Sequence, residues 1–228
     1  VFLPHFGYQQ KEQIPYPKKQ YDLFFAGSFY GTKEAEENIN QMPEVFQQIA
    51  KRTLCMLLDN HSLTLEKALE LHLKSIQFEC DAEEFVELVN YMVPVDQYIR
   101  EYYRTQVIES ILEAGITLTV CGAGWMKLKE KYPDNLNILS EEGLDITEVI
   151  QLISDSKMVL NILPTFKCGT HERIFTIMMN GSVCVADENV LLKELFTDEE
   201  NIVFYSMKDI GSLPGKIKYL LSHEEEAE

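Results

Sequence analysis

The feature that most constrains the fold is a pair of apolar runs separated by a short helical pattern. Met158–Pro164 (MVLNILP) and Ser182–Ala186 have the length and composition of buried strands, and Glu172–Met179 between them has helical spacing. Gly181 is placed to end that helix. Two buried strands joined by a helix form a crossover unit of a parallel sheet, so the chain is predicted to be an α/β protein.

The polar loop before this helix is a candidate anion site. In a parallel sheet it lies at the carboxyl ends of the strands, where ligands bind, next to helix N–H groups that lack intrahelical partners. Arg173 adds a permanent charge whose fork geometry suits phosphate. The helix dipole disfavours a cation in a first turn, which favours an anionic partner. The alternative is a surface arginine paired with a nearby carboxylate such as Glu172 or Asp187.

Neighbours of Arg173 are further candidates for this loop. His171 could donate to the same phosphate or cap the helix, and Lys167 is a second cation. The candidates from the loop and the first helical residue are Lys167, Gly169, Thr170, His171 and Glu172.

The rest of the chain repeats the alternation of strands and helices. The predicted strands are Tyr21–Ala26, Ile116–Cys121, Leu136–Leu139, Met158–Leu163, Ser182–Ala186 and Ile202–Tyr205. The predicted helices of the second half are Ile146–Ile153, Glu172–Met179, Leu191–Leu195 and Leu213–Leu221. This order predicts a Rossmann-like, mainly parallel sheet with helices on both faces. We expect a lead-in over residues 1–20 and one domain over 21–228, with a helical insertion at about 33–114.

Two glycine turns follow predicted strands. Gly27-Ser28 could direct N–H groups at a diphosphate, although an ordinary strand-ending turn is the simpler interpretation. Gly122 and Gly124 form only part of a glycine-rich fingerprint. Trp125, the sole tryptophan, is interpreted either as a wall beside a nucleobase or as a core anchor.

Composition excludes several classes of function. The formal charge of −17 argues against a binder of duplex nucleic acid or of an anionic membrane surface. No apolar run is long enough to span a bilayer, and no signal peptide opens the sequence. Five cysteines without CxxC pairs favour reduced thiols, so a cytoplasmic location is expected. No cluster has metal-ligand spacing, and neither a metal nor a cofactor is expected.

Longer stretches carry a family resemblance. The segment LNILPTFKCGTHERIFTIMMNGSVCVAD, the leader toward Leu195-Phe196, the strand Val203–Tyr205 and the last helix resemble the C-terminal half of CgeB-like glycosyltransferases. Upstream, YDLFFAGSF and ILEAGITLTVCGAGW resemble the family's opening strand and its helix–strand–Gly-x-Gly-Trp segment. The resemblance covers most of residues 21–221 and is weakest over 31–90.

The resemblance implies a GT-B enzyme with two Rossmann-like domains. This chain would be the C-terminal domain, which binds the nucleotide-diphosphate sugar, with a UDP-sugar as the first guess. The lead-in would be the interdomain hinge, and the N-terminal half and the acceptor would lie outside this chain. Arg173 would offset the charge of the departing diphosphate, a catalytic role. Thr176 stands where related retaining enzymes often carry a carboxylate for ribose, and its hydroxyl is a weaker candidate contact.

Two other kinds of function stay open on sequence. One is a catalytically inactive glycosyltransferase-like module retained for interaction, with Thr176 marking a lost ribose site. The other is a Rossmann-like scaffold domain whose negative charge serves a basic partner. The sequence gives neither the sugar nor the stereochemical outcome, and it identifies no catalytic base.

Overall fold

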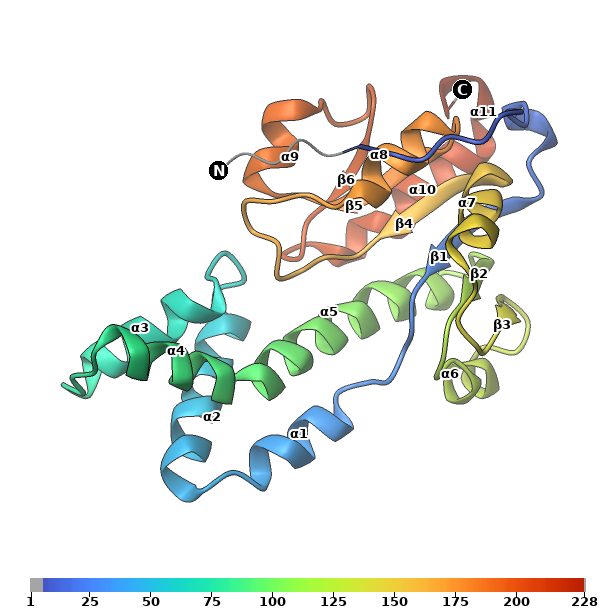
Figure 1. Cartoon of the computed structure of the whole chain (residues 1–228). Helices are drawn as coiled ribbons and strands as arrows, with labels where there is room; N and C mark the ends of the chain where they lie inside the picture. The colour runs from blue at the N-terminus through green and yellow to red at the C-terminus, as the bar shows by residue number, and fades with distance from the viewer. Residues whose placement is uncertain (1–5, 228) are drawn as a thin grey trace. The chain divides into compact units, whose positions relative to one another are not determined.

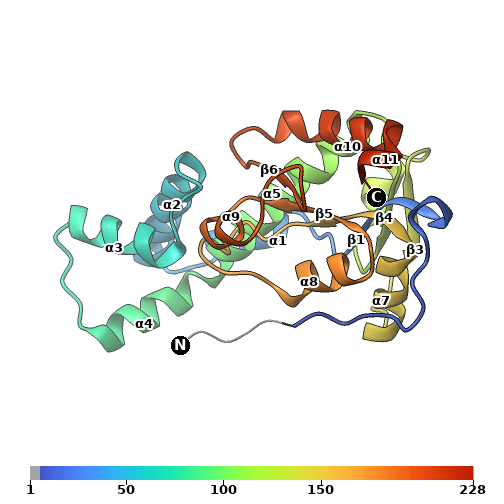
Figure 2. The same cartoon turned by 90° about the horizontal axis from the view of Figure 1, so that it is seen from above.

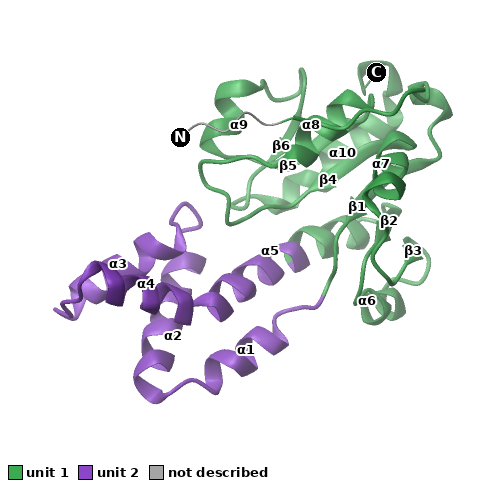
Figure 3. Cartoon of the chain, in the orientation of Figure 1, with its two compact units in different colours: residues 1–29, 106–228 green, residues 30–105 purple. Residues whose placement is uncertain are grey.

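The chain divides into two compact units in the computed structural model, which describes residues 6–227. The sheet unit comprises the residues up to Phe29 and those from Gln106 onward, and the helical unit is Tyr30–Thr105 (Figure 3). The predicted insertion ends at 114, whereas the helical unit ends at Thr105, because the last turns of the intervening helix join the core of the sheet unit. Residues 1–5 of the predicted lead-in, and Glu228, lie outside the described residues.

The sheet unit contains one six-stranded, all-parallel sheet with the order β3-β2-β1-β4-β5-β6 (Figure 1). The strands are β1 (Tyr21–Ala26), β2 (Leu118–Cys121), β3 (Leu136–Ser140), β4 (Ser156–Asn161), β5 (Val183–Asp187) and β6 (Val203–Tyr205). The four inner strands are almost wholly buried because helices cover both of their faces. The predicted Rossmann-like α/β fold is confirmed.

Alternate side chains of β1, β2, β4, β5 and β6 enter two separate cores. Phe25 and Leu160 pack with α5 (Val93–Glu113), α6 (Met126–Lys131) and α10 (Leu213–Ser222). Phe24 and Val159 pack with α7 (Ile146–Ser154), α8 (Glu172–Met179) and α9 (Val190–Leu195). Figure 2 shows α5 and α10 on one side of the strands and α7 and α8 on the other.

Most predicted boundaries agree with the structure to within one or two residues, and the predicted helix over 172–179 is α8 itself. One difference matters for the site. The strand predicted at Met158–Leu163 is β4 at Ser156–Asn161, because the N–H of Leu163 bonds the Asp187 carboxylate instead of a neighbouring strand. The sequence patterns did not predict the short helices α6 and α11 (Glu224–Ala227).

The helical unit has its own core. Its helices are α1 (Lys33–Asn40), α2 (Glu44–Asp59), α3 (Leu65–Ser75), α4 (Ala82–Tyr91) and the first part of α5. Asp81 and Glu84 form a capping box at the start of α4, and the rings of Phe46 and Tyr91 stack at 4.5 Å. Across residues 6–227, no helix is long and apolar enough to cross a membrane.

Residues 6–20 form a strap along α8 (Figure 1). The Asn180 side chain accepts from the N–H of Gln10 at 2.9 Å and donates to the carbonyl of Tyr8 at 2.7 Å. Gly7 packs so closely that a Cβ there would lie 2.7 Å from backbone atoms of Phe175 and Thr176. The strap includes the 3-10 turn Tyr16–Lys18 and leads directly into β1.

The contact at Gly7 gives a test of the strap. Gly7→Ala should displace the strap because the added methyl meets backbone rather than a movable side chain, at a cost of about 1–3 kcal/mol. We expect faster tryptic cleavage after Lys11 than in the parent chain. Gly143→Ala is the matched control, because a Cβ at Gly143 meets nothing within 4 Å. Equal cleavage rates for the two variants would contradict the packing described here.

Candidate functional site

The strand order reverses between β1 and β4, which marks the carboxyl edge of the sheet as the expected ligand-binding position. After β1 and β2 the chain continues to α5 and α6 on one face, whereas after β4 and β5 it continues to α8 and α9 on the other. Connections that leave a parallel sheet toward opposite faces open a crevice where ligands bind. The loop 162–171, which we call the β4–α8 loop, leaves the sheet at this edge and contains four of the twelve predicted site residues: Lys167, Gly169, Thr170 and His171.

Arg173 lies in the first turn of α8, partly buried against the sheet. Burial raises the pKa of the Cys121 and Cys184 thiols, and the Arg173 charge lowers both. Cys121 ends β2 and Cys184 lies in β5, so the guanidinium influences groups on both sides of the β1–β4 pair. A positive charge with this position suits an anion bound at the carboxyl edge.

Two buried oxygens near this edge lack a hydrogen-bond partner within the described chain. They are Oδ1 of Asn161, the last residue of β4, and Oγ1 of Thr170 in the β4–α8 loop. The two residues are 1% and 5% exposed. A buried acceptor or hydroxyl without a partner costs free energy, which a ligand or a water can recover. Thr170 is a predicted site residue, whereas Asn161 was not; its only signal is a polar residue inside the apolar run MVLNILP.

His171 is the N-cap of α8. Its Nδ1 accepts from the N–H of Arg173 at 3.2 Å, and the Glu172 carboxylate lies 2.9 Å from the same nitrogen. The first contact needs a neutral ring and the second a ring protonated at Nδ1, so the two exclude each other. Of the two interpretations left open for His171, capping is the one for which the geometry gives a hydrogen bond.

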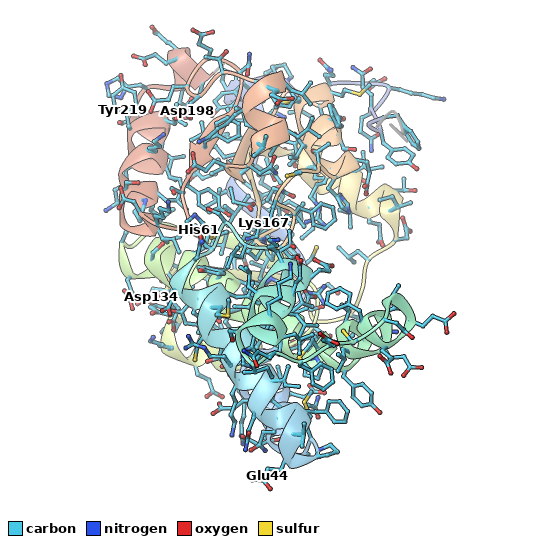
Figure 4. All side chains as sticks on the ribbon, turned by 90° about the vertical axis from the view of Figure 1, so that its left-hand side faces the viewer. Glu44, His61, Asp134, Lys167, Asp198 and Tyr219 are labelled. Carbon is cyan, nitrogen blue, oxygen red and sulfur yellow. The ribbon has the colours of Figure 1, made fainter. Side chains whose placement is uncertain are left out.

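Lys167, labelled in Figure 4, is directed toward its own loop. Its ammonium donates to the carbonyl of Pro164, burial lowers its pKa, and the Asp187 charge opposes that shift. Asp187 ends β5 and is 5% exposed. Burial raises the Asp187 pKa to about 6, against the lowering effects of the Leu163 N–H and the Lys167 charge. The hydrogen bond from the Leu163 N–H to the buried Asp187 carboxylate attaches the start of the loop to the end of β5, and the partly buried Lys167 lies close enough for its charge to lower the Asp187 pKa.

The two glycine turns pack against each other. The Gly27 N–H donates to Cys121, and the Gly122 N–H donates to Ser140, both at 2.9 Å. A Cβ at Gly122, whose φ is +126°, would lie 2.6 Å from the Gly27 carbonyl oxygen and 3.0 Å from the Ser28 nitrogen. For Gly27 this corrects the expectation of an N–H directed at a diphosphate, because a neighbouring strand already binds that group.

Trp125 is a core residue rather than an exposed wall. It is fully buried, its indole N–H donates to the Gly27 carbonyl at 2.9 Å, and its ring stacks on Phe29. Gly124, just before it, has a φ of +91° that shapes the turn. Of the two interpretations of Trp125, the structure supports the core anchor.

Thr176 lies beneath the strap. It is 3% exposed, and its hydroxyl accepts from the N–H of Tyr8 at 3.1 Å. The expected ribose contact is therefore corrected: in this structure the hydroxyl binds the chain's own backbone. Residues 1–20 were expected to be a hinge, and sequence patterns gave no sign that their described part packs on α8.

A wide groove lies at the opposite, amino edge of the sheet. Its volume is about 770 Å³, and it is lined by the starts of β5 and β6 and by α10. The cation there, Lys216, is already paired with Asp198 and Glu199 at 2.9 and 3.2 Å (Asp198 is labelled in Figure 4). The neutralised charge makes this groove a poorer anion site than the carboxyl edge. Within residues 6–227, no group of three or more His, Cys, Asp or Glu side chains is arranged to hold a metal ion.

Comparisons with known proteins identify the family of the chain. A family model described as glycosyl transferase-like matches residues 100–228, more than half of the chain. Among solved structures, the chain is similar to Anabaena Alr3699/HepE in complex with UDP, with 10% identity and a TM-score of 0.41. That match covers 91% of this chain and 92% of the other, and a likeness so distant carries no functional inference. No curated protein matches the chain significantly.

The raised pKa of Asp187 gives a stability test. Between the ordinary carboxyl pKa and about 6, the folded chain binds a proton at Asp187 that the unfolded chain does not. Stability from this group therefore falls as pH rises through that window. Asp187→Asn keeps an oxygen for the Leu163 N–H and removes the titration. From pH 5 to pH 8, the parent chain should lose roughly 1 kcal/mol of unfolding free energy relative to the variant.

Urea denaturation of both proteins at the two pH values measures this difference. Comparing the two proteins cancels the titration of all groups that they share. A parallel pH dependence of their unfolding free energies would show that Asp187 does not titrate as described.

Proposed function

The chain belongs to the glycosyl transferase-like family, and we propose that its sheet unit binds the donor, a nucleotide-diphosphate sugar. The observation that carries the proposal is the position of Arg173, in the first turn of α8 at the edge where the strand order reverses. A diphosphate is the part of such a donor that most needs a fixed cation and helix N–H groups. Joined to a second Rossmann-like half, the chain would transfer the sugar to an acceptor.

The chemical role of Arg173 follows from where charge develops. When the bond between the sugar and the diphosphate breaks, negative charge grows on the leaving phosphate oxygens. A guanidinium fixed beside them stabilises that charge more in the transition state than in the ground state, which is what accelerates a reaction. No metal is required for this role, since the cation is supplied by the chain.

Two neutral groups complete the proposed donor site. The unpartnered oxygens of Asn161 and Thr170 offer an acceptor and a hydroxyl to sugar or ribose hydroxyl groups. His171 organises the start of α8, and Lys167 shapes the loop that precedes it. Of the residues predicted from sequence, Gly169 lies in the same loop. Gly27 and Trp125, which are joined by a hydrogen bond, support the edge by packing.

One observation favours the alternative that the chain is a catalytically inactive glycosyltransferase-like module. Where related retaining enzymes often carry a ribose carboxylate, Thr176 instead binds the strap. A chain that binds nucleoside diphosphate tightly but gives no transfer or donor hydrolysis with its second half present would be an inactive module.

The proposal is tested by calorimetric titration with UDP, GDP and their sugars. We expect a saturable signal with at least one nucleoside diphosphate. Arg173→Ala should raise the dissociation constant by about 10- to 100-fold. This corresponds to the roughly 1.5–3 kcal/mol that a hydrogen bond to a charged group contributes. Lys216→Ala is the matched control, because it removes one positive charge from the same unit at the opposite edge. A folded chain without affinity for any nucleoside diphosphate would refute the proposed function.

A further inference from the structure

One side chain links the β4–α8 loop to the segment after β5. The carboxamide of Asn189 donates from Nδ2 to the Gly169 carbonyl at 3.0 Å and accepts at Oδ1 from the N–H of Leu192 at 3.0 Å. The first bond reaches the loop four residues before Arg173. The second bond caps α9. Since Asn189 is fixed at the start of a helix, its Nδ2 presents a fixed anchor to the loop.

The bonds on either side of Asn189 follow the same path. The N–H of Val190 donates to the Lys167 carbonyl at 3.4 Å, and the Asp187 carboxylate accepts from Leu163 at 2.9 Å. The β4–α8 loop is therefore attached to the end of β5 near its beginning and again in its second half. Among these attachments, the Asn189 bond lies nearest to the residues that carry the candidate site.

A loop that binds an anion must be ordered when the ligand arrives. If it is ordered only part of the time, the apparent dissociation constant rises by the inverse of the ordered fraction. The loop contains Gly169, whose backbone has more freedom to lose than that of other residues. A hydrogen bond at that residue limits this loss before binding rather than during it.

We propose that Asn189 is a positioning residue for the donor site, which acts by holding the β4–α8 loop in the binding conformation. This inference rests on the proposed function for the identity of the ligand. The two polar atoms of this side chain have different roles. Oδ1 stabilises α9, and Nδ2 orders the loop that carries Thr170 and leads to Arg173.

The two halves of the side chain can be tested separately. Asn189→Asp keeps an oxygen for the Leu192 N–H but has no donor for Gly169, so the melting temperature should stay close to that of the parent chain. Affinity for UDP, or for the nucleoside diphosphate that the parent binds best, should fall roughly tenfold, the value of one hydrogen bond. Without nucleotide, amide hydrogen exchange should become faster over residues 163–171 and stay unchanged elsewhere in the sheet unit.

The matched control is Asp145→Ala. Asp145 caps α7 with bonds to Thr147 and Glu148, so its loss destabilises the same unit without touching the loop. We expect a lower melting temperature with unchanged nucleotide affinity and unchanged exchange over 163–171. Asn189→Asp should therefore lower nucleotide affinity without lowering the melting temperature, and Asp145→Ala should do the reverse.

Each outcome has a distinct meaning. An Asn189→Asp variant that binds nucleotide like the parent, or that loses affinity only in step with its melting temperature, overturns the positioning role and leaves the proposed function intact. A parent chain that binds no nucleoside diphosphate refutes the proposed function and the positioning role with it. Unchanged exchange over 163–171 in Asn189→Asp overturns the loop attachment whether or not nucleotide binds.

Discussion

The pairing of β1 with β4 is the constraint on which the rest of the sheet unit depends. The two strands are separated in sequence by the helical unit and by β2 and β3, yet they lie side by side in register from Tyr21 and Ser156. Each is buried on both faces, so every other strand and covering helix is placed by reference to this pair. The same pairing reverses the strand order, and the reversal marks the carboxyl edge as the expected ligand-binding position.

The β4–α8 loop, which leads to the candidate site, is held in place by residues that follow it in the sequence. Arg173 supplies charge, but the loop before it is held by groups that follow β5: the buried carboxylate of Asp187 and the carboxamide of Asn189. A buried carboxylate is costly, as its raised pKa indicates, and the structure retains it where it binds the first residues of the loop. The strap occupies the other side of α8, where Asn180 bonds to its backbone.

Sequence patterns predicted the sheet well because buried strands and capped helices have local signals. They predicted Arg173 at a helix start for the same reason. They could not predict that Thr176 would bind the strap, or decide between the core and the wall interpretations of Trp125, because both outcomes depend on contacts between segments distant in sequence. Asn161 was missed because one polar residue at a strand end is unremarkable until its neighbours show that its oxygen has no partner.

We propose above that a nucleoside diphosphate binds at the carboxyl edge beside the β4–α8 loop. Hydrogen exchange with and without saturating UDP, read peptide by peptide, tests this location most directly. If the nucleotide binds there, amides over residues 161–174 should gain protection, with little change at the opposite edge around residues 199–203. Protection confined to the opposite edge, or to the helical unit, would contradict it.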